Sequence, residues 1–267
     1  MILYKYVPFD DGKRILENGS VRFTQPEFFN DPFDLPYYPR EASANPVGGI
    51  FDRLHTMGKE EIWKKNTGIL SLTRTPTNPL MWAHYADKHR GIVIGIDAIA
   101  AGLTDEKTNL IPAQYGSVIY VSQRQEQPFI GKFRTGLSVG STHHFPHDHY
   151  EKLQRLFLHK PLCWAYEEEV RVVKCLKGLS HDNPSNPSRY FKVLGKEQEE
   201  LYLYLLPPEA ITEVNFGFKI DTFIADDLFY QAKKRRPELR IFECYLDGGN
   251  LSVGFKKYVT LADAANG

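Results

Sequence analysis

The stretch Lys160-Pro-Leu-Cys-Trp-Ala-Tyr-Glu-Glu-Glu-Val-Arg-Val-Val173 carries charges inside a segment that otherwise reads as a β-strand. In an extended backbone alternate side chains share a face, so Glu167, Glu169 and Arg171 are expected to project together. Buried charge is costly unless it is paired, so this row is expected to border solvent or a polar cleft. The alternative interpretation is that these side chains lie on the solvent-exposed face of an antiparallel strand and form weak surface ion pairs.

Further strands are predicted before and after this segment. Residues 68–74 alternate apolar and hydroxyl side chains, which places Ser71 and Thr73 on one face of a strand. Residues 91–96 form a nearly continuous apolar run, which is typical of a central strand buried on both faces. The other extended segments are predicted at residues 2–7, 21–24, 118–121, 200–206, 211–218 and 240–245, the last being the final strand.

Helices and loops alternate with these strands. A helix is predicted over residues 78–88, with Asn78 as its N-cap and Pro79 in its first turn. Three segments that are rich in Pro, Gly or polar residues read as loops, at 36–50, 123–148 and 180–189. The other helices are predicted at 10–18, 51–65, 149–160 and 221–235. Without a repeat or linker, the pattern predicts a single α+β domain over residues 1–267, with a mostly antiparallel split sheet flanked by helices.

Composition limits the functional classes. Lys and Arg number 33, as do Asp and Glu, so no global field favours nucleic acid or membrane. No stretch approaches the roughly 18 apolar residues of a membrane span, and residues 1–6 do not resemble a signal peptide, so a cytoplasmic protein is predicted. Cys163, Cys175 and Cys244 have no paired spacing and are predicted to be reduced thiols.

Two polar motifs lie in predicted loops. Four histidines in His143-His-Phe-Pro-His-Asp-His149 have a density that can bind a transition metal, but no complementary ligand spacing accompanies them. A surface loop or helix cap is therefore the favoured interpretation, and no metal is expected. Asn30 and Asp34 lie in Phe29-Asn-Asp-Pro-Phe-Asp34, where they are either turn formers or ligand contacts.

The segment Met81-Trp-Ala-His-Tyr85 places Met81 and Tyr85 on one face of the predicted helix. Met81 and Trp82 are expected in the core. Tyr85 and His84 keep hydrogen-bonding tips that can reach a cleft.

Together these motifs resemble a bacterial family of uncharacterised domains, the domain-of-unknown-function family numbered 2971. The resemblance covers residues 3–171, and the chain beyond residue 175 adds little. The segments that carry it run in order: Leu3-Tyr-Lys-Tyr6, Phe29-Asn-Asp-Pro-Phe-Asp34, Ile69-Leu-Ser-Leu-Thr73, Met81-Trp-Ala-His-Tyr-Ala-Asp87 with His89-Arg-Gly91, and Lys160 with Trp164-x-Tyr-Glu-x-Glu-x-Arg171.

That family is similar in pattern and layout to the ADP-ribosyltransferase superfamily, which builds an NAD cleft from polar positions on a first, a middle and a late strand. The resemblance implies that Glu169 and Glu167 are catalytic. The usual His or Arg of the first strand is absent here, and Tyr6, Lys5 or Arg90 is its candidate substitute. The residues implied in NAD binding are Tyr4, Lys5, Tyr6, Asn30, Ser71, Thr73, Tyr85, Arg90 and Arg171.

The implied chemistry assigns roles to these side chains. Breaking the nicotinamide–ribose bond develops oxocarbenium character, which Glu169 would stabilise while Glu167 orients or deprotonates the acceptor. A guanidinium suits bidentate phosphate contact. The candidates for stacking on nicotinamide are Tyr6 and Tyr85, those for contacting the pyrophosphate are Lys5, Arg90 and Arg171, and Lys160 alternatively neutralises the two glutamates.

The expected function is therefore NAD-dependent mono-ADP-ribosyl transfer by a bacterial toxin or phage-defence effector. NAD is the substrate, a nucleic acid or protein is the acceptor, and an antitoxin is a further implied partner. A metal-dependent nuclease is the alternative, in which Glu167, Glu169 and Asp34 or Asp97 hold Mg²⁺ with help from Lys160. A third reading is a non-catalytic module that senses a nucleotide.

Overall fold

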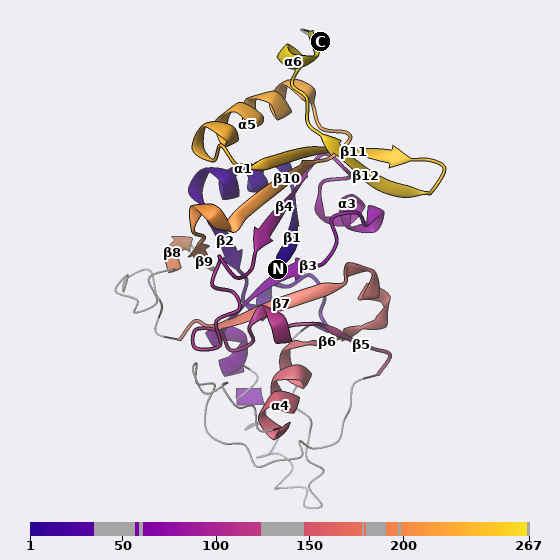
Figure 1. The fold of residues 1–267 in the computed structure, drawn as a ribbon. Helices are drawn as coiled ribbons and strands as arrows, with labels where there is room; N and C mark the ends of the chain where they lie inside the picture. Colours follow the sequence, from indigo (N-terminus) through magenta and orange to yellow (C-terminus); the bar gives the residue numbers. More distant parts are fainter. Residues whose placement is uncertain are drawn as a thin grey trace, which may run out of the picture.

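The computed structural model describes residues 1–34, 57–58, 61–123, 147–177, 179, 191–196 and 199–265 (Figure 1). Its largest element is a seven-stranded sheet in which all neighbouring strands are antiparallel except β10 and β11. No helix in this part of the chain has the length and apolarity needed to cross a bilayer. The strand order is β12 (Ser252–Lys257), β11 (Arg240–Asp247), β10 (Ile211–Phe216), β4 (Ile92–Asp97), β1 (Ile2–Val7), β3 (Thr67–Thr73), β7 (Glu169–Cys175).

Two smaller sheets accompany the large one. The first joins β2 to β9 and β8, and a bridge between Thr24 and Ile69 connects the end of β2 to β3. The second is a parallel pair, β5 with β6. Their strands are β2 (Ser20–Phe23), β8 (Phe191–Lys196), β9 (Glu199–Leu205), β5 (Ile119–Val121) and β6 (His159–Pro161). The mostly antiparallel mixed architecture predicted from the sequence is confirmed.

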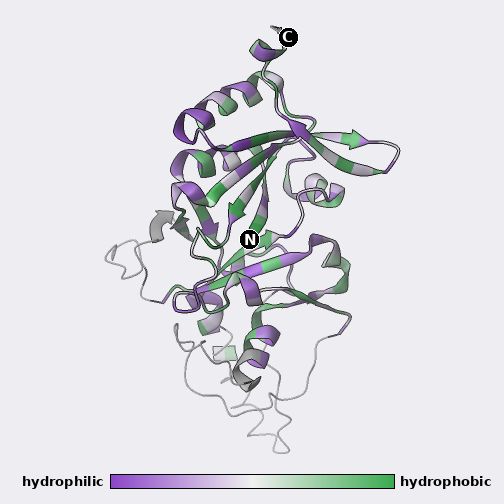
Figure 2. Ribbon diagram, in the orientation of Figure 1, coloured by the Kyte–Doolittle hydropathy of each residue, from purple (hydrophilic) through white to green (hydrophobic). Residues whose placement is uncertain are grey.

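The central strand β4 divides the core into two faces. Ile92, Ile94 and Ile96 point to one face, where they join α1 (Phe9–Asn18) and α5 (Thr222–Arg235). Val93 points to the other face and packs with α3 (Pro79–Tyr85). Residues 92–96 are buried throughout, as predicted for a central strand. Figure 2 shows hydrophobic segments along the inner strands of the sheet.

The edge strand β7 is covered by the chain that follows β4. Ile111 and Ser117 form bridges to Val173 and Val170, and the Arg171 N–H donates to the Gly116 carbonyl at 2.8 Å. A Cβ atom at Gly116 would lie 1.9 Å from the Arg171 carbonyl oxygen, so this approach requires glycine. Both edges of β7 are therefore paired, and its charged side chains, Glu169, Arg171 and Lys174, are buried.

The strand predicted to begin at Glu167 begins at Glu169 instead. Residues before it form a 3-10 helix, η4 (Leu162–Glu167), and Glu168 adopts a left-handed conformation with φ 44°. A two-residue alternation of charges does not distinguish a short 3-10 turn from the start of a strand, which is why the prediction was wrong for Glu167. Trp164 and Tyr166 therefore belong to η4.

Other predicted boundaries also needed correction. The helix predicted over residues 78–88 ends at Tyr85, because the backbone turns left-handed at residues 87–89. The segment after β11 forms a further strand, β12, so β11 is not the final one; the pair extends away from the body of the molecule (Figure 1). The predicted helix at 149–160 is α4 (His147–Phe157), which places Lys160 on β6.

Several predictions fall on residues outside the described part. These are the loops at 36–50 and 180–189, nearly all of the loop at 123–148, and the beginning of the helix predicted at 51–65. The histidine cluster also lies outside it, apart from the backbone of the first turn of α4.

Candidate functional site

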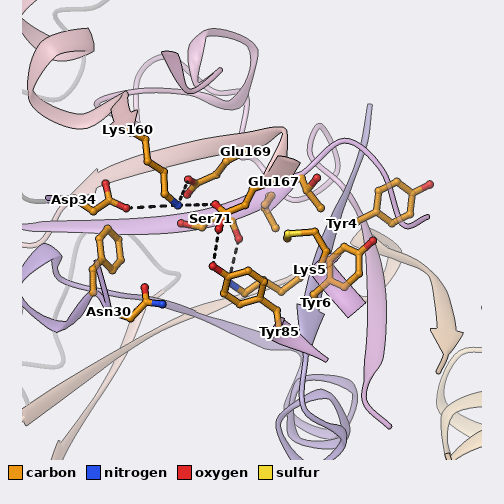
Figure 3. A pocket seen from close by; sticks show the side chains of 14 residues that line it. Tyr4, Lys5, Tyr6, Asn30, Asp34, Ser71, Tyr85, Lys160, Glu167 and Glu169 are labelled. Atoms are coloured by element: carbon orange, nitrogen blue, oxygen red, sulfur yellow. Dashed lines mark hydrogen bonds and ion pairs between the residues drawn. The ribbon is translucent and has the colours of Figure 1, made fainter. Parts of the chain in front are cut away.

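One pocket collects side chains from both the large sheet and the elements beside it. The space between its lining atoms is about 550 Å³, the open mouth included. Figure 3 shows its polar side chains converging from separate elements. The lining residues are Tyr4, Lys5, Tyr6, Phe29, Asn30, Asp34, Ser71, Leu72, Thr73, Met81, Tyr85, Lys160, Glu167 and Glu169.

Strand register sets one wall of this pocket. Tyr4 on β1 is the partner of Thr73 on β3, and Thr73 is in turn the partner of Glu169 on β7. In antiparallel pairs, directly opposite residues point to the same face of the sheet. Tyr4, Thr73 and Glu169 therefore form one row across three adjacent strands, and all three line the pocket.

A single ammonium group connects the acidic residues of the pocket. Lys160 Nζ lies 2.5 Å from Glu167 Oε2, 3.0 Å from Glu169 Oε2 and 3.7 Å from Asp34 Oδ2. All four side chains are less than a tenth exposed. Because buried carboxylates need a compensating cation, Lys160 allows Glu167 and Glu169 to lie together.

The guanidinium of Arg171 lies behind Glu169. Its Nε donates to Glu169 Oε1 at 2.9 Å, and its Nη2 donates to Asp34 Oδ2 at 2.5 Å and to Glu169 Oε2 at 3.1 Å. Its Nη1 donates to the Phe157 carbonyl at 2.7 Å. Arg171 is 1% exposed and does not line the pocket. It therefore fixes Glu169 and Asp34 from the protein side.

These contacts determine the charge of Glu169. Burial opposes ionisation, but Arg171 and Lys160 outweigh it and lower the pKa of Glu169 to about 2. Burial also disfavours the charged form of Lys160, yet Glu169, Glu167 and Asp34 raise the Lys160 pKa above its usual value. The site therefore holds an anionic Glu169 beside a protonated Lys160 at neutral pH.

Glu167 is joined to the opposite wall through Tyr85. The Tyr85 hydroxyl donates to Glu167 Oε1 at 2.5 Å, so both oxygens of Glu167 are hydrogen-bonded. Burial and the neighbouring Glu167 raise the pKa of Tyr85, which keeps its proton. Tyr85 reaches the pocket from the last turn of α3. That helix begins at Asn78, whose side chain accepts from the Leu80 and Met81 amides as the sequence predicts for an N-cap.

Lys5 lies on the floor of the pocket. Its ammonium donates to the Ser71 carbonyl at 3.0 Å. Burial lowers the pKa of Lys5, and this effect exceeds the opposing attraction of Glu169 and Glu167. A buried ammonium with a lowered pKa gains from an anion placed beside it.

Most residues implied by the sequence resemblance lie together in this pocket, and two do not. Arg90 is exposed in the turn after α3, outside the lining set. Arg171 is buried behind Glu169. Tyr6 lines the pocket, but its hydroxyl donates to the Thr75 carbonyl at 3.0 Å and its ring packs edge-on against Trp82, so it is held in place. The residues brought together are Tyr4, Lys5, Tyr6, Asn30, Ser71, Thr73, Tyr85, Glu167 and Glu169.

Sequence reasoning missed part of the lining. Phe29 and Leu72 were not expected in the site, and their only signal was a position next to a predicted site residue along the chain. Met81 lies in the core, as predicted, and also lines the pocket. Asp97, an alternative metal ligand in the sequence reading, lies elsewhere, since its carboxylate contacts the N-terminal amine and the Ile99 amide.

The fold and pocket define a mixed α/β protein with a polar, carboxylate-bearing cleft beside a large, mostly antiparallel sheet. A family described as "Protein of unknown function (DUF2971)" matches residues 81–172. The match includes Tyr85, Lys160, Glu167 and Glu169, and it does not reach β1 or β3. No curated protein and no solved structure matches the chain.

Proposed function

We propose that this protein is an NAD-dependent mono-ADP-ribosyltransferase. The row formed by Tyr4, Thr73 and Glu169 carries the proposal, because it joins a first, a middle and a late strand at one pocket that holds an anionic carboxylate. This is the layout that the sequence resemblance implies. A toxin or phage-defence role in the cytoplasm, with an antitoxin as partner, belongs to the same proposal.

The proposed reaction uses Glu169 as a fixed negative charge. As the bond between ribose C1′ and the nicotinamide nitrogen breaks, nicotinamide leaves with the electron pair and positive charge develops on the ribose. A carboxylate that is already ionised and oriented stabilises that charge without reorganising. The acceptor nucleophile then bonds to C1′, and its proton passes to Glu167, which lies on the acceptor side beside Tyr85.

Lys5 is the cation best placed to contact the NAD pyrophosphate. Lys160 already contacts three carboxylates, and Arg171 is buried behind Glu169. Among the described residues, Lys5 donates one hydrogen bond, to the Ser71 carbonyl, and an ammonium has three N–H donors. The described contacts therefore leave two donors for a phosphate. Tyr85 is the candidate for stacking on nicotinamide, because Tyr6 is held by Thr75 and Trp82.

Binding without turnover is the second candidate, and one observation favours it. Both oxygens of Glu167, the proposed base, already accept hydrogen bonds, from Tyr85 and Lys160. A carboxylate so fully bonded is a weak base, whereas the electrostatic effect of Glu169 does not depend on a free oxygen. The nuclease alternative is less compatible with the site, because Mg²⁺ would have to compete with Lys160 and Arg171 for the same oxygens.

Purified protein incubated with NAD tests the proposal through nicotinamide release and transfer of labelled ADP-ribose. Glu169→Gln is expected to lower release by about 100-fold or more, as for loss of one transition-state stabiliser. Glu168→Gln is the matched control, because Glu168 is adjacent but exposed, and it should behave as wild type. Calorimetry with NAD and circular dichroism would show whether each variant still binds and folds.

The possible results separate the candidates. NAD binding without nicotinamide release would support the sensing module. Cleavage of DNA or RNA that requires Mg²⁺ and proceeds without NAD would support the nuclease. Equal release by wild type and Glu169→Gln would overturn the role of Glu169.

A further inference from the structure

A second hollow adjoins the pocket on the side of Tyr85. Asn30 and Tyr85 line both hollows, so the two adjoin at these residues. Figure 3 shows Asn30 and Tyr85 across the pocket from Lys160. We call this hollow the outer cleft, and its lining residues are Asn30, His84, Tyr85, Cys163, Trp164 and Tyr166.

The outer cleft is built mainly from rings. The His84 and Tyr166 rings are 6.1 Å apart between centroids and tilted by 36°, and the Trp164 and Tyr166 rings are 6.1 Å apart and tilted by 42°. His84 and Tyr85 are 6.4 Å apart with an angle of 63°. These separations lie near the upper end of aromatic contact distances, so the rings border a space rather than fill it.

The same short helix orients the outer cleft and the acid pair. Trp164 and Tyr166 on η4 border the outer cleft, while Glu167, the last residue of η4, is buried in the pocket. Lys160 Nζ lies 5.2 Å from the centroid of the Trp164 ring, close enough for a cation–π contact. A group bound against these rings would therefore lie next to Glu167 and Tyr85.

The chemistry of the lining selects a flat, uncharged ligand with hydrogen-bonding edges. No Asp, Glu, Lys or Arg is among the described residues that line the outer cleft, and the carboxylate beside it, Glu167, is already paired with Lys160. Aromatic side chains bind nucleobases by stacking. An asparagine amide offers one donor group and one acceptor, which complements the edge of a base.

We propose that the outer cleft binds the acceptor of ADP-ribosyl transfer and that this acceptor is a nucleobase. The proposal rests on the function proposed above and specifies its acceptor. A nitrogen of the base bonds to ribose C1′ as the bond from C1′ to nicotinamide breaks, and nicotinamide leaves with the electron pair. The proton lost by that nitrogen passes to Glu167 and then to solvent. The base belongs either to a free nucleoside or to a single-stranded nucleic acid.

Binding of a fluorescent base tests the cleft without any turnover. We expect 2-aminopurine riboside to bind the wild-type protein, and Trp164→Ala to weaken it by about fivefold or more through loss of stacking. Trp164→Phe, which keeps a ring, should restore most of the affinity. Leu162→Ala is the matched control, because Leu162 is an exposed residue of η4 outside the outer cleft, and it should bind as wild type.

Binding of a second ligand shows whether the acceptor base belongs to a free nucleoside or to a single-stranded nucleic acid. A single-stranded hexanucleotide that contains 2-aminopurine should bind more tightly than the riboside if the acceptor is a nucleic acid, and no more tightly if it is a free nucleoside. Wild-type affinity in Trp164→Ala would overturn the proposal. Binding of tyrosinamide in place of the riboside would also overturn it, because it would indicate an aromatic protein acceptor.

Transfer assays distinguish failure of this proposal from failure of the proposed function. With NAD and no acceptor, nicotinamide release to water reports on the pocket alone. With a nucleoside added, Trp164→Ala should lose a larger fraction of transfer than of release to water, whereas Leu162→Ala should keep both. If release occurs but transfer to the base is the same in wild type and Trp164→Ala, the outer cleft proposal fails while the proposed function stands. If the base binds but NAD is neither bound nor cleaved, the proposed function fails and the transfer role of the cleft fails with it.

Discussion

The ammonium nitrogen of Lys160 lies 2.5 Å from the Oε2 atom of Glu167. Lys160 is on β6, directly before η4, and Glu167 is the last residue of η4, so this contact closes the helix back onto the strand that leads into it. The same ammonium contacts Glu169 at 3.0 Å. One cation therefore fixes the shape of η4 and bridges the pair of carboxylates.

Replacement of Lys160 is expected to destabilise the fold. Lys160→Met leaves Glu167, Glu169 and Asp34 buried with a single remaining cation, and breaking a buried pair in this way typically costs about 3–5 kcal/mol. This decrease in the free energy of unfolding should be smaller at pH 5 than at pH 8, because carboxylates without a cation are more readily protonated. Urea unfolding of wild type and variant at both pH values measures the decrease. Lys177→Met, at an exposed lysine near the end of β7, should change stability by about 0.5 kcal/mol or less; equal losses in both variants would contradict this account.

Glu169 is expected to make stability depend on pH in the acid range. Its folded pKa of about 2 lies below the usual 4.5, so its ionised form is favoured by folding. The stabilisation is complete above about pH 4.5 and is lost as the pH falls toward 2. A shift of this size corresponds to about 3 kcal/mol. Guanidinium unfolding from pH 5 to pH 2.5 should show a steeper loss for wild type than for Glu169→Gln, and parallel curves would refute the assignment.

The sequence predicts those parts of the site that depend on local pattern. Ser71 and Thr73 alternate with leucines, so their common face was readable, and Asn78 before a proline was readable as a cap. The register that places Thr73 opposite Glu169 was not readable, because it depends on pairing between segments far apart in the chain. The contact of Asp34 with Arg171 joins residues 137 apart, and nothing local to Asp34 distinguishes it from a turn former.

The left-handed Glu168 marks another limit of sequence reading. A glutamate has no intrinsic preference for positive φ, and tertiary contacts on both sides hold it there. Lys160 fixes Glu167, while Glu169 accepts from Arg171 and its amide donates to the Tyr120 hydroxyl. The conformation of this residue therefore follows from the charge cluster, and only the folded structure reveals it.

Lys5 is expected to make NAD affinity depend on pH in the alkaline range. A pyrophosphate beside Lys5 raises its pKa in the complex above the lowered value in the free protein. Affinity should therefore be constant below the free-protein pKa and fall, by up to tenfold per pH unit, as the pH rises above it. Calorimetry with NAD from pH 7 to pH 10 measures the dependence. Lys5→Met should bind NAD more weakly, with an affinity that does not change with pH. Nicotinamide riboside lacks the pyrophosphate, so its affinity for the wild-type protein should not change with pH in this range.

Gly116 is expected to tolerate no side chain. Alanine there would place Cβ 1.9 Å from the Arg171 carbonyl oxygen, which is backbone and is fixed in the sheet. The added methyl group would overpack this contact, which costs about 1–3 kcal/mol or more in the free energy of unfolding. The chain around Gly116 would then separate from β7 and expose the edge of that strand beside Glu169 and Arg171. Thermal unfolding of Gly116→Ala should show the loss. Gly248→Ala is the matched control, because nothing lies within 4 Å of its added Cβ; a loss there as large as in Gly116→Ala would argue against the steric explanation.

Asn78 is expected to couple helix capping to the outer cleft through different atoms of one side chain. Its Oδ1 accepts from the Leu80 and Met81 amides, while its Nδ2 donates to the Tyr166 carbonyl at 2.5 Å. Asn78→Ser keeps a capping oxygen and loses the donor, whereas Asn78→Ala loses both. Asn78→Ala should therefore be less stable than Asn78→Ser by about 1 kcal/mol in urea unfolding.

The two Asn78 variants should nevertheless weaken 2-aminopurine riboside binding to a similar extent, by severalfold, because each releases η4 from α3 by one hydrogen bond. The comparison shows whether weaker binding is caused by the lost hydrogen bond or by lower stability. If lower stability were the cause, Asn78→Ala would lose more affinity than the other variant. Wild-type affinity in Asn78→Ser would show that Tyr166 keeps its place in the outer cleft without the Asn78 amide.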